Sequence, residues 1–183
     1  SIFYLFLFTL NLNEKGVGVN GLVVADTGNL DAERKKALGS LKECADLITL
    51  EVLPNEGAKV GSIYDTDDES FCGCFNQCIR YLQENTKAQI VVIIMIGGND
   101  HEPEFINEKR GITQFEFAEI IERVAKLNGV PVINVFCEAG FGYARVKARD
   151  YQVDHIHLNE LGGKNIGKFV WSKLKDIPTW DKE

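Results

Sequence analysis

The stretch QIVVIIMI (residues 89–96) is, after its first position, an unbroken run of apolar and mostly β-branched residues. Such a run, without alternation of apolar and polar residues, is typical of a strand that is buried on both faces of a sheet. Three further runs have the same character: VNGLVVA (19–25), DLITLEVL (46–53) and VPVINVF (130–136). The four runs predict four strands of one central sheet.

Apolar residues at helical spacing fill the intervals around these runs. The predicted helices cover residues 30–45, 67–85, 112–128 and 159–175. Strands that alternate with helices predict an α/β fold of three layers, in which a mostly parallel sheet carries helices on both faces. No repeat or linker divides the chain, and its 183 residues with 45% hydrophobic content are enough for one domain, residues 1–183.

The net charge of −7 argues against nucleic acid as a partner, because there is no basic stripe to neutralise phosphates. It favours a neutral or small-molecule partner. The opening SIFYLFLFTL is apolar but too short to span a membrane, and it lacks the basic region and the cleavage site of a signal peptide. We expect either a buried first strand here or the remainder of a removed segment.

Three of the five cysteines lie close together in FCGCFNQC, residues 71–78. Cys74 and Cys78 are one helical turn apart, which suggests a metal or redox site. However, the spacing of Cys72, Cys74 and Cys78 lacks the paired C-x2-C pattern of structural zinc, and no histidine lies near in sequence. The pattern favours small apolar residues on a buried helix face.

Ligands of open α/β sheets bind at the carboxyl ends of the strands. The stretch YQVDHIHLNELGG (151–163) lies between the last predicted strand and the last predicted helix. A hydrolase with a hydroxyl nucleophile needs a base to take its proton and a carboxylate to hold the tautomer of the base. We predict His157 as this base and Asp154 as its carboxylate, with His155 as a flanking polar residue. The alternative is an aspartate before a helix, beside two surface histidines.

The order of elements and the terminal VDHIHLNELGG resemble the SGNH (GDSL-type) esterase and lipase family from about residue 17 onward. The resemblance implies a flavodoxin-like three-layer fold and hydrolysis of acyl esters by a Ser-His-Asp mechanism. It also implies that no cofactor or metal takes part. The expected partner is a small-molecule or carbohydrate ester, with acetylated carbohydrate as one substrate class. Secretion is common in the family, so a secreted or periplasmic location is expected by analogy.

The family also places an asparagine after a strand, where its amide helps to bind the oxyanion. Asn99 in GGND matches that pattern in sequence, but the family has two strand–helix units between this motif and Asp-x-x-His, and only one follows Asn99 here. Counting back two units reaches Asn55 in LPNE. The stretch after it, residues 61–93, also resembles a bacterial branch of the family. We therefore predict Asn55 as the oxyanion residue, with Asn99 as the alternative. If Asn99 has no such role, GGND is an ordinary tight turn after a strand.

The nucleophile cannot be assigned from a motif, because Gly-Asp-Ser does not occur in the chain. Thr27 in VVADTG would take this place if GGND were the asparagine motif. If Asn55 is the oxyanion residue, the nucleophile falls near Ser1. The strand that should carry it is then either absent or replaced by IFYLFLFTL. Two hypotheses follow: an SGNH-type ester hydrolase, or an inactive binding module of the same fold that has lost its nucleophile.

Overall fold

The structure is a computed structural model that describes residues 3–10, 18–24, 47–52, 59–67, 69–95, 104–108, 110–141, 151–154 and 157–177, with backbone alone for 3–10 and 18–24. Its main sheet has the strand order β2-β1-β3-β4-β7. The strands are β1 (Phe3–Leu10), β2 (Gly18–Val24), β3 (Leu47–Val52), β4 (Gln89–Ile94) and β7 (Val132–Asn134). All four predicted strands are therefore present, and the opening apolar run forms a fifth.

Strand direction divides this sheet into two parts. β3, β4 and β7 run parallel to one another, whereas β1 runs antiparallel to both of its neighbours. The mostly parallel sheet is thus confirmed, with one reversed strand inside it. Because Phe3 pairs with Val24, the start of β1 and the end of β2 lie at the edge toward which β3 points.

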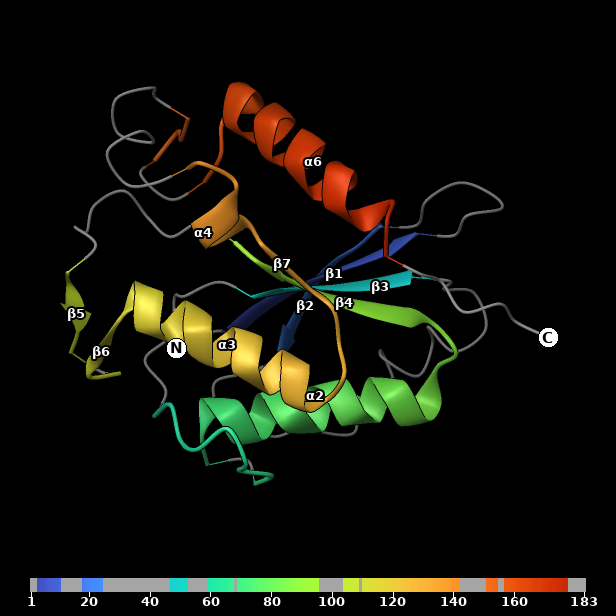
Figure 1. Ribbon diagram of the computed structural model, residues 1–183, viewed down its shortest axis with the longest axis vertical. Coiled ribbons are helices and arrows are strands. Elements are labelled where there is room, and N and C mark those ends of the chain that lie inside the picture. Colours follow the sequence, from blue (N-terminus) through green and yellow to red (C-terminus); the bar gives the residue numbers. More distant parts are fainter. Residues whose placement is uncertain are drawn as a thin grey trace.

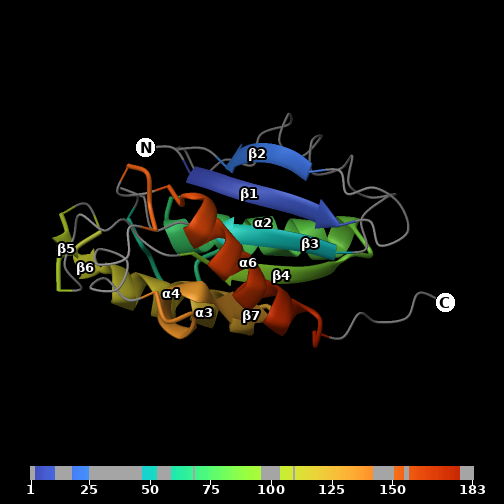
Figure 2. The same ribbon diagram turned by 90° about the horizontal axis from the view of Figure 1, so that it is seen from above.

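Helices cover both faces of the sheet, as predicted (Figures 1 and 2). α2 (Phe71–Asn85) and α3 (Gln114–Leu127) lie on one face, and α4 (Val135–Glu138) and α6 (Glu160–Leu174) lie on the other. A small hairpin of β5 (Ile106–Asn107) and β6 (Ile112–Thr113) precedes α3. The predicted helix over residues 30–45 lies outside the described residues.

Side chains of β3 and β4 alternate between two cores. Ile48, Leu50 and Val52 pack with α2 and α3, together with residues of β4. The residues that alternate with them face the other side, where Leu47, at the start of β3, packs near Ile166 of α6. These two strands are therefore buried on both faces, which is the property that their apolar runs predicted.

Among the predicted boundaries that differ from the structure, two have a clear local reason. The strand predicted over 130–136 ends at Asn134, because the Asn134 side chain accepts a hydrogen bond from Cys137 N at 2.9 Å and begins the short helix α4. The helix predicted from residue 67 begins only at Phe71, because Ser70 caps it by accepting a hydrogen bond from Gly73 N. In both cases a polar side chain at a helix start ends the preceding segment.

The three clustered cysteines lie on the buried side of α2, as expected. Desolvation raises the pKa of Cys72 and of Cys78 to about 12, so both remain neutral thiols near pH 7. Among the described residues, no group of histidine, cysteine, aspartate and glutamate side chains could hold a metal ion. In the same part of the chain, no helix has the length and apolarity to cross a membrane.

Candidate active site

The Asp-x-x-His segment forms a narrow turn between two short pieces of extended chain. Gln152 and Leu158 form an isolated antiparallel bridge. The backbone N–H of Val153 donates to the carbonyl of His157 at 2.8 Å, and that of Asn159 donates to the carbonyl of Tyr151 at 2.9 Å. These bonds close the turn at its base and hold Asp154 and His157 on the same short loop.

Asp154 holds His157 by both of its carboxylate oxygens. Oδ2 lies 2.6 Å from Nδ1 of the His157 ring, and Oδ1 accepts the backbone N–H of His157 at 2.7 Å. Because a carboxylate is an acceptor, this contact assigns the proton of the neutral imidazole to Nδ1. Nε2 then carries the lone pair that a general base needs.

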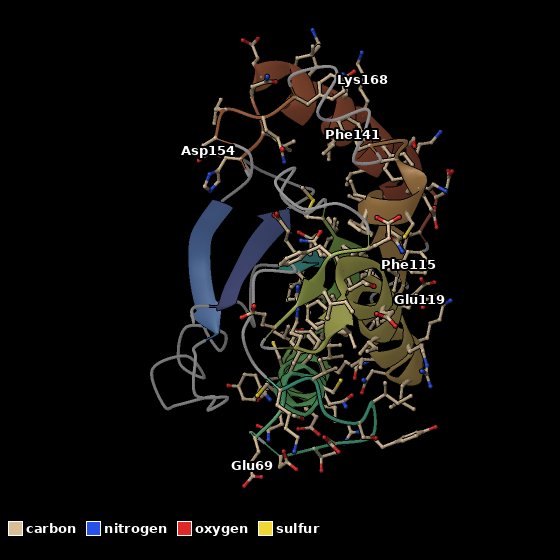
Figure 3. All side chains as sticks on the ribbon, turned by 90° about the vertical axis from the view of Figure 1, so that its left-hand side faces the viewer. Glu69, Phe115, Glu119, Phe141, Asp154 and Lys168 are labelled. Atoms are coloured by element: carbon tan, nitrogen blue, oxygen red, sulfur yellow. The ribbon has the colours of Figure 1, made fainter. Side chains whose placement is uncertain are left out.

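The pair lies at the surface of the molecule. The side chains of His157 and Asp154 are 73% and 53% exposed. In Figure 3, Asp154 lies at the opposite end of the molecule from Glu69. An exposed base can approach a bound substrate, but solvent also weakens the ion pair that it forms with Asp154.

The turn connects directly to α6, and this connection sets its place relative to the sheet. The Asn159 side chain accepts the backbone N–H of Gly162 at 2.9 Å and so caps the helix. Figures 1 and 2 show that the start of α6 lies toward the edge to which β3 and β4 point. This is the edge where ligands bind in open α/β sheets.

The other predicted site residues, Asn55, Asn99, Ser1 and Thr27, lie outside the described residues, as does His155. In sequence, Asn55 follows the end of β3 by three residues and Asn99 follows the end of β4 by five. These two strands are adjacent and parallel. Both asparagines therefore follow strands that end at the same edge, so the register of the sheet does not choose between them.

Glu51 is a notable group that the sequence analysis missed. It lies in β3 between Phe6 of β1 and Ile93 of β4. Desolvation raises the pKa of the Glu51 carboxyl from 4.5 to about 7. A single charged residue inside an apolar run that is buried on both faces is the signal that would have identified it.

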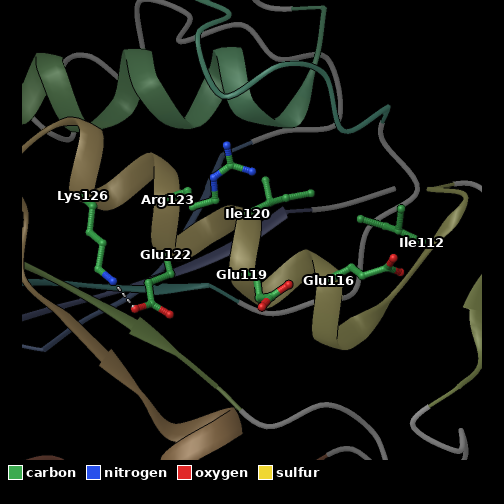
Figure 4. A pocket seen from close by; sticks show the side chains of 7 residues that line it. All are labelled: Ile112, Glu116, Glu119, Ile120, Glu122, Arg123 and Lys126. Carbon is green, nitrogen blue, oxygen red and sulfur yellow. Dashed lines mark hydrogen bonds and ion pairs between the residues drawn. The ribbon is translucent and has the colours of Figure 1, made fainter.

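A hollow of the surface lies on α3, which packs on the face of the sheet opposite to α6 (Figure 4). It is lined by three glutamates and two basic residues together with two isoleucines: Glu116, Glu119, Glu122, Arg123, Lys126, Ile112 and Ile120. Lys126 donates to Glu122 at 2.6 Å across one turn of the helix. The hollow combines charges of both signs and holds no hydroxyl or thiol nucleophile among these residues, so we do not assign it to catalysis.

Comparison with known proteins gives similarity at the level of the fold. No family model and no curated protein sequence matches the chain. A protein of known structure from Lactobacillus plantarum has 23% identity and a TM-score of 0.65, over 77% of this chain and 72% of that one. A second solved structure has 18% identity and a TM-score of 0.65, over 82% and 75% of the two chains.

A third solved structure is that of a peptidoglycan O-acetylesterase. It has 18% identity and a TM-score of 0.58, over 79% of this chain. All three similarities are similarities of the α/β fold. The matched region covers 41% of the esterase chain, so most of that protein has no counterpart here.

Proposed function

We propose that the protein is an SGNH-type hydrolase of acyl esters, with acetyl esters on carbohydrate as the substrate class. The observation that carries the proposal is the contact of 2.6 Å between Asp154 and Nδ1 of His157, at the ligand-binding edge of an SGNH-like sheet. The similarity of this fold to that of a peptidoglycan O-acetylesterase supports an O-acetylated glycan as the substrate.

In the proposed reaction, Nε2 of His157 takes the proton of a hydroxyl nucleophile as its oxygen attacks the ester carbonyl. Asp154 stabilises the imidazolium that forms and keeps the ring oriented. The imidazolium then gives the proton to the leaving alcohol, which leaves an acyl-enzyme. Water, activated by the same ring nitrogen, releases the acid and restores the hydroxyl. The reaction requires no cofactor and no metal.

Asn55 is the proposed donor to the oxyanion, through its side-chain amide. Its place three residues after β3 supports this role, since β3 ends at the same edge of the sheet. Asn99 is the second candidate, on the match of GGND to the family motif.

Two hydroxyl residues are candidates for the nucleophile. Ser1 precedes β1 by two residues and Thr27 follows β2 by three, and the pairing of Phe3 with Val24 brings these two strand ends together. Both hydroxyls therefore adjoin, in sequence, strand ends at the edge where the site is proposed.

A fluorophosphonate probe tests the proposal and finds the nucleophile at the same time. We expect the natural gene product to hydrolyse p-nitrophenyl acetate, to lose this activity when labelled, and to carry the probe on one serine or threonine in peptide mass spectra. Heat-denatured protein is the control for unspecific labelling. A folded protein that neither hydrolyses the ester nor takes up the probe would refute the enzyme and favour a binding module.

A further inference from the structure

The first turn of α6 touches the chain that enters the Asp154–His157 turn. Gly162 is buried at this contact, and a Cβ atom added to it would lie 2.3 Å from the carbonyl oxygen of Tyr151 and 3.0 Å from Cδ2 of Leu158. The oxygen belongs to the backbone, so no rotation of a side chain relieves the first clash. A methyl group here would require the two segments to separate by about 1 Å to reach ordinary van der Waals contact.

The same carbonyl takes part in the bonds that close the turn. The Tyr151 oxygen accepts the backbone N–H of Asn159 at 2.9 Å, and the Asn159 side chain accepts the N–H of Gly162 at 2.9 Å. Tyr151, Asn159 and Gly162 therefore form one connected unit, which we name the base of the turn. Asp154 and His157 lie on the loop between Tyr151 and Asn159.

The base of the turn is itself fixed to the body of the protein. Tyr151 is buried, and its ring lies 5.0 Å from the ring of Phe141, centroid to centroid. Ile166, one helical turn beyond Gly162, packs with Val91 and Ile93 of β4. A separation of Tyr151 from Gly162 therefore distorts the exposed loop more readily than the buried residues beneath it.

We propose that Gly162 is a positioning residue that, through the base of the turn, sets the geometry of the Asp154–His157 pair. The meaning of this geometry for catalysis rests on the proposed function, whereas the geometric claim can be tested without any activity.

The chain offers matched controls for this claim in the same helix. An added Cβ atom at Gly163 or at Gly167 meets nothing within 4 Å. Alanine is favoured over glycine inside helices. Gly163→Ala and Gly167→Ala are therefore expected to preserve or raise the midpoint of thermal unfolding and to leave the pair unchanged.

The primary test is the two-bond ¹H–¹⁵N correlation spectrum of histidine-labelled full-length protein, which reports which ring nitrogen carries the proton. The signal of His157 is assigned with His157→Gln. In the parent protein, and in both control variants, we expect the neutral ring to hold its proton on Nδ1 alone. In Gly162→Ala we expect a mixture of Nδ1-H and Nε2-H forms.

A parent-like spectrum in folded Gly162→Ala would overturn the proposal, and so would an equal change in Gly163→Ala. If Gly162→Ala does not fold, Asn159→Ala removes the side-chain bond to the N–H of Gly162 without a steric clash, and the same two results decide. Thermal unfolding of every variant separates a change of geometry from a loss of structure.

Turnover provides a second test if the parent hydrolyses p-nitrophenyl acetate. A displacement of about 1 Å in a catalytic group can lower the rate about 100-fold. We expect a loss of this size in kcat for Gly162→Ala with little change in KM, and no loss for Gly163→Ala. A parent without esterase activity would refute the proposed function and leave the spectroscopic test intact. An active parent with unchanged kcat in Gly162→Ala would refute the positioning role.

Discussion

Two polar groups of the molecule, the buried Asn76 and the exposed Asp154–His157 pair, differ in what their hydrogen bonds do. On the face of α2 and α3, Asn76 is fully buried and bonds to the carbonyls of Ile63 and Asp65 and to the side chain of Asn128. On the face of α6, Asp154 and His157 bond to each other but remain exposed. A buried hydrogen-bond network stabilises the fold but cannot be reached by a substrate. An exposed pair can be reached by a substrate but contributes little to stability.

This contrast predicts the largest effect for His157→Ala. If the protein hydrolyses p-nitrophenyl acetate, loss of the base should lower kcat by roughly 10³-fold or more. The midpoint of thermal unfolding should hardly change, because the side chain is 73% exposed. His155→Ala is the control and should retain turnover; the opposite result would reverse the assignment of the two histidines.

The reverse outcome is expected for Asn76→Ala. This change removes three hydrogen bonds from a buried side chain and leaves carbonyl oxygens without their donor. We expect a loss of roughly 3–4 kcal/mol in the free energy of unfolding, measured by urea denaturation, with turnover preserved below the transition. Gln83→Ala removes an exposed bond to the carbonyl of Asn128 and should cost far less. Equal losses would show that burial does not distinguish these bonds.

Glu51 offers a smaller test that depends on pH. Its pKa is raised to about 7 in the folded chain, so the folded state holds the proton more tightly than the unfolded state, whose value is near 4.5. Its contribution to stability is therefore fully present below pH 4.5 and is lost as the pH rises through 7. Glu51→Gln should exceed the parent in free energy of unfolding by roughly 2–3 kcal/mol at pH 8 and match it near pH 4. A difference independent of pH would refute the raised pKa.

The smallest effect concerns thiol reactivity on the two faces. Cys137 is exposed after β7, whereas Cys72 and Cys78 are buried in α2. With iodoacetamide at pH 8 we expect Cys137 to be modified at least about tenfold faster than the other two, because exposed thiols react and buried ones are inert. Urea should abolish the difference. Fast labelling of Cys78 in the folded protein would contradict the buried arrangement.

The sequence predicted the interior of the fold better than its edges. β3 and β4 were identifiable because a strand buried on both faces is apolar at nearly every position. The direction of β1 was not identifiable, since an apolar run has the same pattern in either direction. The end of β7 was missed because Asn134 reads as part of a strand until its capping bond to Cys137 is seen.

The candidate site was predictable where it is local in sequence. Asp154 and His157 are three residues apart, so a turn alone brings them together. Asn55 and the nucleophile come from distant segments, so no local turn brings them to the pair. The reversed β1 precedes both asparagines in the chain and does not bear on the choice between Asn55 and Asn99, but it changes the strand order where the nucleophile was expected.

The reversed β1 also has a consequence for solubility. It pairs along β3 from Phe6 to Leu10 and thereby occupies the hydrogen-bonding groups of that side of β3. Without β1, β3 would become an edge strand whose side chains Ile48 and Leu50 are apolar and whose backbone is unpaired on the side away from β4. Such edges recruit strands from other molecules. A shortened chain that begins after residue 10 is therefore expected to aggregate, even though it retains the complete Asp154–His157 turn.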